Sequence, residues 1–340
     1  MIVTMQQNAT KQNFEKITTY LMNKGYGIKD SSSENLMVFG VIGDTKSLNP
    51  NDLEAFEGVK NVTRVSTPYK LASRSFKKTD TIITLANGTV IGADQFVVMA
   101  GPCSVESYEN TLEIAKSASK SGATILRGGA YKPRTSPYAF QGMGIDGLKI
   151  LREVADKFNM AVVSEIMSED LIEAFEPYVD IYQIGTRNMQ NYNLLKQLGA
   201  RTQKPILLKR GMSATIEEWL MSAEYIMASG NENVILCERG IRTFEKYTRN
   251  TLDISAVLAI KELSHLPIVI DPSHAAGKYS MIERLSMASQ AVGADGIIVE
   301  IHPDPEHALS DGAQSLKLEK FDSMMGKLKE LSSVLDKKVK

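Results

Sequence analysis

The 340-residue sequence has little of several features that mark particular classes of protein. It contains only two cysteines, too few for a disulfide framework. Its 39 basic residues nearly balance its 40 acidic residues, so charge gives no reason to expect a nucleic-acid or membrane-surface protein. The start lacks the pattern of a signal peptide, and no apolar run is as long as a membrane span. These absences favour a cytoplasmic protein whose thiols are free or bind a metal.

The apolar content is sufficient for a large core, because 43% of the residues are hydrophobic and the length exceeds one average domain. Residues 1–68 alternate short apolar runs with amphipathic ones. This order predicts a βαββαβ module, a small sheet with helices on one face. We interpret residues 69–95 as a linker and a β-hairpin against the larger domain, with its turn at Asn87-Gly88.

From residue 96 to the C-terminus, helical patterns separate eight short apolar runs: FVVMAGP, ATILRGG, MAVVSEI, IYQIG, PILLKRG, VILCERG, LPIVIDPSH and GIIVEIHP. Eight strand-helix units in about 240 residues match the size of a closed (β/α)8 TIM barrel. The alternative is an open doubly wound sheet, which usually has fewer units and a glycine-rich turn after its first strand. This chain has GPCS there. We therefore expect an α/β protein with its barrel at residues 96–340.

A polar residue ends or follows each of the eight runs: Cys103, Arg127, Glu165, Arg187, Lys209, Arg239, His274 and Glu300. In a barrel these positions lie at the carboxyl ends of the strands, where active sites are found. Any single one could be structural, in an ion pair or a turn. Eight residues in the same position of eight units are hard to obtain from packing alone, so the pattern predicts one polar site.

Part of this set has the chemistry of metal ligands, namely Cys103, His274 and Glu300, joined by Asp311 in the loop after the eighth run. Sulfur, imidazole and carboxylate donors together suit Mn²⁺, Fe²⁺, Co²⁺, Zn²⁺ or Cu²⁺ better than Ca²⁺ or Mg²⁺, and the sequence does not rank these five ions. The structural alternatives are a buried apolar thiol and a hydrogen-bonded loop histidine. The convergence of the candidate ligands on neighbouring barrel positions favours a single divalent metal site.

Six cations are expected at the same end of the barrel: Arg127, Lys132, Arg134, Arg187, Lys209 and Arg239. Their mutual repulsion requires anions, so they predict phosphate or carboxylate ligands, the alternative being salt bridges to glutamates around the rim. The segment LRGGAYKPRTSPYAFQGMG is too long for a tight strand-helix turn. Unless it is an ordinary solvated loop, it presents donors that suit a phosphate on Lys132, Arg134, Thr135 and Ser136.

These motifs resemble those of the 3-deoxy-D-arabino-heptulosonate 7-phosphate (DAHP) synthases, in particular the type I beta subgroup with a ferredoxin-like, ACT-like N-terminal domain. The resemblance rests on motifs that follow in order through residues 96–316: AGPCSVES, LRGGAYKPRTSPY, IGTRN, LLKRG, CERGIRTFE, IDPSHAAG, VEIHPDP and LSDGAQSL. It implies a transferase that condenses phosphoenolpyruvate with D-erythrose 4-phosphate and water to give DAHP and phosphate. This is the first step of the shikimate pathway, which leads to chorismate and the aromatic amino acids.

The resemblance also implies a role for each matching residue. The metal ligands are Cys103, His274, Glu300 and Asp311. The phosphoenolpyruvate site comprises Arg127, Lys132, Arg187, Lys209 and Arg239. The erythrose 4-phosphate site comprises Arg134, Thr135, Ser136 and Asp311. The catalytic residues are Lys132, Glu165, Cys103 and His274, with Glu165 close to a bound water.

The resemblance further implies feedback inhibition by phenylalanine or tyrosine through the N-terminal domain of a homotetramer, although KDSSSEN near residue 30 does not map an effector pocket. The alternative within the superfamily is 3-deoxy-D-manno-octulosonate 8-phosphate synthase, which uses arabinose 5-phosphate; KPRTS argues against it. Two other classes are less consistent with the motifs. An amino-acid sensor would not need a complete site, and a metal-dependent aldolase that releases no phosphate would not need so many cations.

Overall fold

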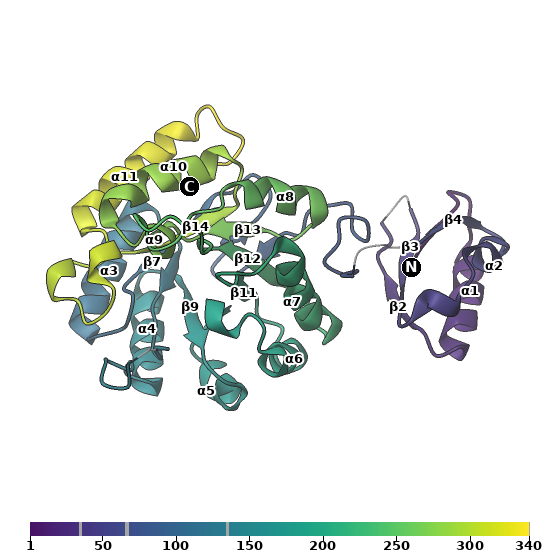
Figure 1. The fold of residues 1–340 in the computed structure, drawn as a ribbon, viewed down its shortest axis with the longest axis horizontal. Helices are drawn as coiled ribbons and strands as arrows, with labels where there is room; N and C mark the ends of the chain where they lie inside the picture. The colour runs from purple at the N-terminus through teal and green to yellow at the C-terminus, as the bar shows by residue number, and fades with distance from the viewer. Residues whose placement is uncertain (34–35, 65–67, 134–135, 340) are drawn as a thin grey trace. The chain divides into compact units, whose positions relative to one another are not determined.

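The computed structural model of the protein describes all residues except 34–35, 65–67, 134–135 and 340. The described chain divides into two compact units, shown in Figure 1. One unit comprises Met1–Thr79 with Leu263–His265, and the other comprises Asp80–Glu262 with Leu266–Lys340. No helix within the described ranges is long and apolar enough to cross a membrane.

The first unit has a four-stranded antiparallel sheet in the order β2-β3-β1-β4. Its elements are β1 (Ile2–Met5), α1 (Lys11–Asn23), β2 (Gly27–Asp30), β3 (Val38–Ile42), η1 (Thr45–Ser47), α2 (Pro50–Glu54) and β4 (Val59–Thr63). Thr10 fixes the start of α1, because its hydroxyl accepts the backbone N–H of Asn13. Ile17 and Leu21 of α1 pack on Val3 of the sheet. The predicted βαββαβ order is confirmed.

The second unit is a closed barrel of parallel strands, in which each strand pairs with its neighbours in sequence and β14 pairs with β7 (Figure 1). The strands are β7 (Val97–Gly101), β8 (Ile125–Arg127), β9 (Ala161–Ile166), β10 (Ile181–Ile184), β11 (Ile206–Lys209), β12 (Val234–Glu238), β13 (Ile268–Ile270) and β14 (Gly296–Glu300). Each strand lies within one of the eight apolar runs. The predicted (β/α)8 barrel is confirmed.

Helices follow the strands: α3 (Tyr108–Ser121), α4 (Ile145–Lys157), α5 (Ile172–Phe175), α6 (Tyr192–Arg201), α7 (Ile216–Ala228), α8 (Ser255–Leu263), α9 (Pro272–Ala276), α10 (Tyr279–Ala291) and α11 (Leu318–Leu331). Side chains of Ser107, Asn191 and Thr215 cap α3, α6 and α7 by accepting backbone N–H groups. Short 3-10 turns lie at η2 (Glu169–Leu171), η3 (Thr186–Asn188), η4 (Pro305–His307) and η5 (Gly312–Gln314). The long loops between these elements carry much of the polar site.

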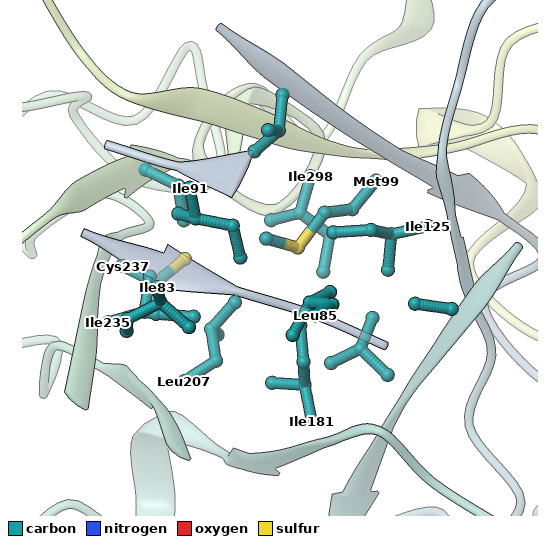
Figure 2. Close-up of a cluster of buried hydrophobic side chains, with 14 residues drawn as sticks. Ile83, Leu85, Ile91, Met99, Ile125, Ile181, Leu207, Ile235, Cys237 and Ile298 are labelled. Carbon is teal, nitrogen blue, oxygen red and sulfur yellow. The ribbon is translucent and has the colours of Figure 1, made fainter. Parts of the chain in front are cut away.

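A two-stranded hairpin, β5 (Ile83–Thr84) and β6 (Val90–Ile91), covers the amino-terminal end of the barrel. Its side chains Ile83, Leu85 and Ile91 pack among inward-facing residues of the barrel strands, including Met99 and Ile125 (Figure 2). This apolar cluster fills the barrel at that end. Polar chemistry is thereby confined to the opposite, carboxyl-terminal end of the strands.

Candidate active site

A cavity of about 250 Å³ opens at the carboxyl ends of the barrel strands. Its walls include Lys132, Ser136, Glu165, Arg187, Lys209, Arg239, Arg249, His274 and Asp311. Eight of these nine residues are among the site residues expected from the sequence, and Arg249 is not. Two further expected residues, Arg134 and Thr135, lie outside the described residues.

The expected metal ligands lie together at one side of this cavity. Cys103, Glu300 and Asp311 each offer a ligand atom, and the three atoms lie within 4.8 Å of one another. His274 of α9 is next to them, with its Nε2 atom 3.4 Å from Oε1 of Glu300. One sulfur, one imidazole nitrogen and two carboxylates form a donor set that fits a divalent transition-metal ion.

Asp271 orients the imidazole of His274. Its Oδ2 atom lies 2.7 Å from Nδ1 of His274, and its Oδ1 atom accepts the backbone N–H of the same residue at 2.9 Å. The carboxylate of Asp271 thus lies beside Nδ1, and Nε2, on the side of Glu300, is the nitrogen left for a metal ion. Burial lowers the pKa of His274, although Asp271 opposes the shift, and this favours the neutral imidazole that binds metals.

Cys103 and Asp311 are held by the surrounding polar groups. The thiol donates to Oδ2 of Asp311 at 3.3 Å, and burial, followed by the charge of Glu300, raises the pKa of Cys103 to about 12. A metal ion that binds this sulfur must therefore displace a proton at neutral pH. Asp311 has a left-handed backbone with φ of 48°, a conformation that aspartate adopts more readily than most residues other than glycine.

Three of the expected cations contact residues of the site, Arg127 and Lys209 from buried positions and Lys132 from a partly buried one. Arg127 Nη1 donates to Oε1 of Glu300 at 2.9 Å. Lys132 Nζ donates to the sulfur and to the carbonyl oxygen of Cys103, both at 3.0 Å. Lys209 Nζ lies 2.5 Å from Oδ2 of Asp271. The site thus contains internal ion pairs as well as a surplus of positive charge along the cavity wall.

The other two described cations have weaker partners. Within the described part of the chain, Arg187 Nη1 donates to the carbonyl oxygen of Pro133, at 3.4 Å. Nη1 of Arg239 is buried and has no hydrogen-bond partner among the described residues. Buried donors are normally satisfied, so an unpaired nitrogen on an arginine that lines the cavity is consistent with a site for an anion. Burial also lowers the pKa of Arg239.

Glu165 lies at the side of the cavity formed by β9 and β10. Its Oε2 atom accepts a hydrogen bond from Nε2 of Gln183 at 3.2 Å. The carboxylate lies directly against Gly185, where a Cβ atom would come 1.8 Å from Oε1 of Glu165. A glycine at position 185 is therefore needed for the carboxylate to keep this position.

Sequence reasoning missed Asp271, Arg249 and Gln314. Asp271 could have been found, because it precedes His274 by three residues, the spacing of a helix N-cap and its N3 residue. Arg249 and Gln314 lie in loops and follow no periodic pattern. Their contacts link two loops across the cavity: Arg249 Nη1 donates to Oε1 of Gln314 at 2.9 Å and lies 3.6 Å from Oδ1 of Asp311. Gln314 in turn donates to Oε2 of Glu300 at 2.8 Å.

Comparison with known proteins places this chain in a family. Residues 80–337 match the DAHP synthetase I family, and residues 1–67 match the DAHP synthase ferredoxin-like domain. The chain belongs to the DAHP synthetase I family. The family predicted from the motifs is thus confirmed.

Individual relatives agree with this assignment. The chain is 50% identical to the phospho-2-dehydro-3-deoxyheptonate aldolase of Thermotoga maritima over 100% of both sequences. A crystal structure of the Thermotoga maritima protein (DAHP synthase) has a TM-score of 0.80 and covers 100% of this chain and 99% of its own. A truncated form of the 3-deoxy-D-arabino-heptulosonate 7-phosphate synthase from Thermotoga maritima has a TM-score of 0.74 at 52% identity, covering 79% of this chain and 98% of its own.

A relative of the alternative class is more distant. The 2-dehydro-3-deoxyphosphooctonate aldolase of Geobacter sulfurreducens is 30% identical over 271 residues, which cover 74% of this chain and 98% of the relative. The match to the heptonate aldolase has the higher identity and spans the whole chain.

Proposed function

We propose that this protein condenses phosphoenolpyruvate with D-erythrose 4-phosphate and water to give DAHP and inorganic phosphate, the first step of the shikimate pathway. The observation that carries the proposal is the cavity whose wall holds Lys132, Arg187, Lys209 and Arg239 together with part of a cluster of Cys103, Glu300, Asp311 and His274. Anion binding and a metal site are both needed for this reaction. Family membership then selects the reaction among those that such a cavity could support.

The phosphoenolpyruvate carboxylate is assigned to Arg127, Lys132 and Lys209, and its phosphate to Arg187 and Arg239. The buried, unpartnered Nη1 of Arg239 supports the assignment, because a phosphate oxygen would satisfy it. The cations already paired with Glu300 and Asp271 are positioned before any ligand arrives. Such preorganisation lowers the cost of binding a doubly anionic molecule.

The phosphate of erythrose 4-phosphate is assigned to Arg134, Thr135 and Ser136, with Asp311 near its other end. Ser136 lies on the cavity wall on the same loop as Lys132. Arg134 and Thr135 are assigned by the resemblance of KPRTS alone, since they lie outside the described residues. This arrangement puts the aldehyde beside Asp311 and the other expected metal ligands.

The residues of this chain that fit a divalent metal are Cys103, His274, Glu300 and Asp311, and the ion is one of Mn²⁺, Fe²⁺, Co²⁺, Zn²⁺ and Cu²⁺. When bound, such an ion supplies a Lewis acid for the aldehyde oxygen of erythrose 4-phosphate. C3 of phosphoenolpyruvate attacks the aldehyde carbon, and Lys132 supplies a proton to the new alkoxide. Glu165 and Lys132 hold the water that adds at C2, and the proton that this water gives up balances the one taken by the alkoxide. The C2–O bond to the phosphate then breaks, the hydroxyl of the hemiketal becomes the C2 carbonyl, and its proton leaves with inorganic phosphate.

We further propose that residues 1–68 form a regulatory domain, residues 69–95 a linker and hairpin, and residues 96–340 the catalytic domain of a cytoplasmic homotetramer. The separate compact unit at the N-terminus supports a separate role for it. Phenylalanine, tyrosine or both are the proposed inhibitors, as the resemblance implies. Titrating each amino acid into a phosphate-release assay of the full chain tests this, and equal rates at all concentrations would refute it.

A competition between the two candidate sugars tests the proposed reaction. The protein is given phosphoenolpyruvate with equal concentrations of erythrose 4-phosphate and arabinose 5-phosphate, and the products are identified by mass spectrometry. We expect the seven-carbon product. A predominance of the eight-carbon product would instead support 3-deoxy-D-manno-octulosonate 8-phosphate synthase.

A further inference from the structure

A buried group of charges, Arg210, Glu238 and Asp253, lies behind the cavity wall. We call it the Arg210 cluster. Arg210 Nη1 lies 3.1 Å from Oε2 of Glu238 and 2.8 Å from Oδ2 of Asp253. The side chains of Arg210 and Glu238 are only 6% and 0% exposed. Removing charges from water is costly, and a buried ion pair often contributes no net stability. The Arg210 cluster therefore calls for an explanation other than stability.

The cluster is next in sequence to two cavity cations. Leu207, Ile235 and Cys237 point into the barrel core, and side chains alternate along a strand. Lys209 and Arg239 thus continue the inward series and line the cavity. Arg210 follows Lys209 directly, and Glu238 precedes Arg239 directly, with both side chains on the outer face of the barrel. The cluster and the cations share the same backbone.

Glu238 also closes the base of the loop formed by residues 239–254. Its Oε1 atom accepts the N–H of Gly240 at 2.6 Å and the N–H of Asp253 at 3.4 Å, so one carboxylate oxygen holds both ends. The base is tight, because Gly240 has φ of 90° and a Cβ atom there would lie 2.7 Å from Cβ of Asn250. Glu238 consequently fixes the direction in which the chain leaves β12.

Arg210 fixes the direction in which the chain leaves the neighbouring strand, β11. Its Nε atom donates to the carbonyl oxygen of Ala214 at 3.0 Å, in the loop after β11, and its backbone N–H donates to the carbonyl oxygen of Cys237 at 3.0 Å. The guanidinium also lies over the ring of Trp219, 5.8 Å from its centroid. The ends of β11 and β12 are thereby joined through one side chain.

The backbone contacts of Glu238 and Arg210 matter most for Arg239. Its Nη1 atom has no partner among the described residues, so the position of the guanidinium depends on where the backbone places it. We propose that Glu238, acting with Arg210 and Asp253, is a positioning residue that sets the backbone of Arg239 and Lys209 for binding phosphoenolpyruvate. The inference rests on the proposed function and adds to it residues that do not touch the ligand.

The net charge of the cluster is consistent with this role. One arginine and two carboxylates leave one negative charge behind a wall that carries Lys209, Arg239 and Arg187. A negative charge at this place offsets the repulsion among the cations before the ligand binds. Burial raises the pKa of Glu238, and the charge of Arg210, 3.1 Å from its Oε2 atom, opposes this shift.

The test uses three variants of the full chain: Glu238→Gln, Asp253→Asn and, as a matched control, Asp180→Asn. Glutamine keeps an oxygen for Gly240 but presents an amide to Arg210. Asp180 also forms an ion pair, with Nη1 of Arg152 at 2.7 Å, and accepts a backbone N–H, but it lies at the start of β10, away from the cavity. Steady-state kinetics, calorimetric titration of phosphoenolpyruvate alone and thermal unfolding are measured for each variant and for the wild type.

We expect Glu238→Gln to raise both the KM and the Kd for phosphoenolpyruvate about tenfold, which corresponds to ~1.4 kcal/mol. The KM for erythrose 4-phosphate should stay near the wild-type value. Asp253→Asn should act in the same direction, and its partly exposed position, 18% for the side chain, protects against a failure to fold. Asp180→Asn should lower the melting temperature without changing either KM.

The possible results distinguish a failure of this inference from a failure of the proposed function on which it rests. If the wild type releases no phosphate from the two substrates, the proposed function fails and the inference fails with it. If the wild type turns over but Glu238→Gln and Asp253→Asn lose only melting temperature, as Asp180→Asn does, the cluster is structural and the inference alone is overturned. Should Glu238→Gln fail to fold, the phosphoenolpyruvate affinity of Asp253→Asn decides.

Discussion

Replacing Cys103 with alanine should abolish metal-dependent turnover and leave the barrel folded. The substitution removes a sulfur that contacts Oδ2 of Asp311 at 3.3 Å and Nζ of Lys132 at 3.0 Å. Neither partner depends on the sulfur alone. Lys132 also donates to the carbonyl oxygen of Cys103, and Asp311 lies 3.6 Å from Arg249. We therefore expect a stability loss of ~1 kcal/mol, the contribution of about one buried methylene-sized group.

The effect on metal binding should be far larger than the effect on stability. Removing an outer hydrogen bond to a metal ligand typically lowers metal affinity 10–100-fold, so losing the ligand itself should cost at least ~100-fold. Chelator-treated protein is titrated with Mn²⁺ or Zn²⁺, and bound metal is measured by atomic emission alongside phosphate release. Unfolding by urea gives the stability of the same samples.

The second cysteine provides the control. Cys237 is also fully buried, but it lies in the apolar cluster inside the barrel. Cys237→Ala should therefore lose a comparable amount of stability and keep its metal affinity. Full activity of Cys103→Ala in metal-replete buffer, with the metal affinity of the wild type, would refute the assignment of Cys103 as a ligand.

Three further predictions concern other parts of the molecule. Ile91→Ala in the hairpin should lower the free energy of unfolding by about 2–5 kcal/mol, because it opens a cavity among fully buried side chains, and both KM values should stay unchanged; urea unfolding and kinetics check this. The raised pKa of Cys103 means that iodoacetamide should alkylate the metal-free protein very slowly at pH 7, and rapid labelling in mass spectrometry would contradict it. Arg239→Met should raise the KM for phosphoenolpyruvate about 10–100-fold, the loss of a charged hydrogen bond of 1.5–3 kcal/mol; an increase confined to the KM for erythrose 4-phosphate would show that Arg239 serves the other substrate.

The barrel and many of the candidate site residues could be predicted from the sequence, because both predictions depend only on where the strands end. An apolar run predicts a strand, and the residue that ends it must lie at the carboxyl end of the barrel. Glu165, Lys209 and Glu300 are of this kind, as they lie at or next to the ends of β9, β11 and β14. The fact that these residues lie close together was predicted in this way without any knowledge of loop structure.

Features that depend on loops or on very short helices were not predictable in this way. The five residues of α9 are too few for a periodic pattern, and so are the short η2 and the four residues of α5. Arg249 reaches Asp311 from the long loop after β12, a contact set by tertiary packing alone. Salt bridges to glutamates around the rim were considered only as an alternative to ligand binding. Arg127 does pair with Glu300, and Lys209 pairs with Asp271 and still lines the cavity.

The most direct measurement of the central claim is the inorganic phosphate released from phosphoenolpyruvate by the wild-type chain with each sugar in turn, before and after chelation. The account predicts release with erythrose 4-phosphate, loss of that release after treatment with chelator, and recovery on addition of a divalent transition metal. Preference for arabinose 5-phosphate, or a rate that chelator does not change, would contradict it.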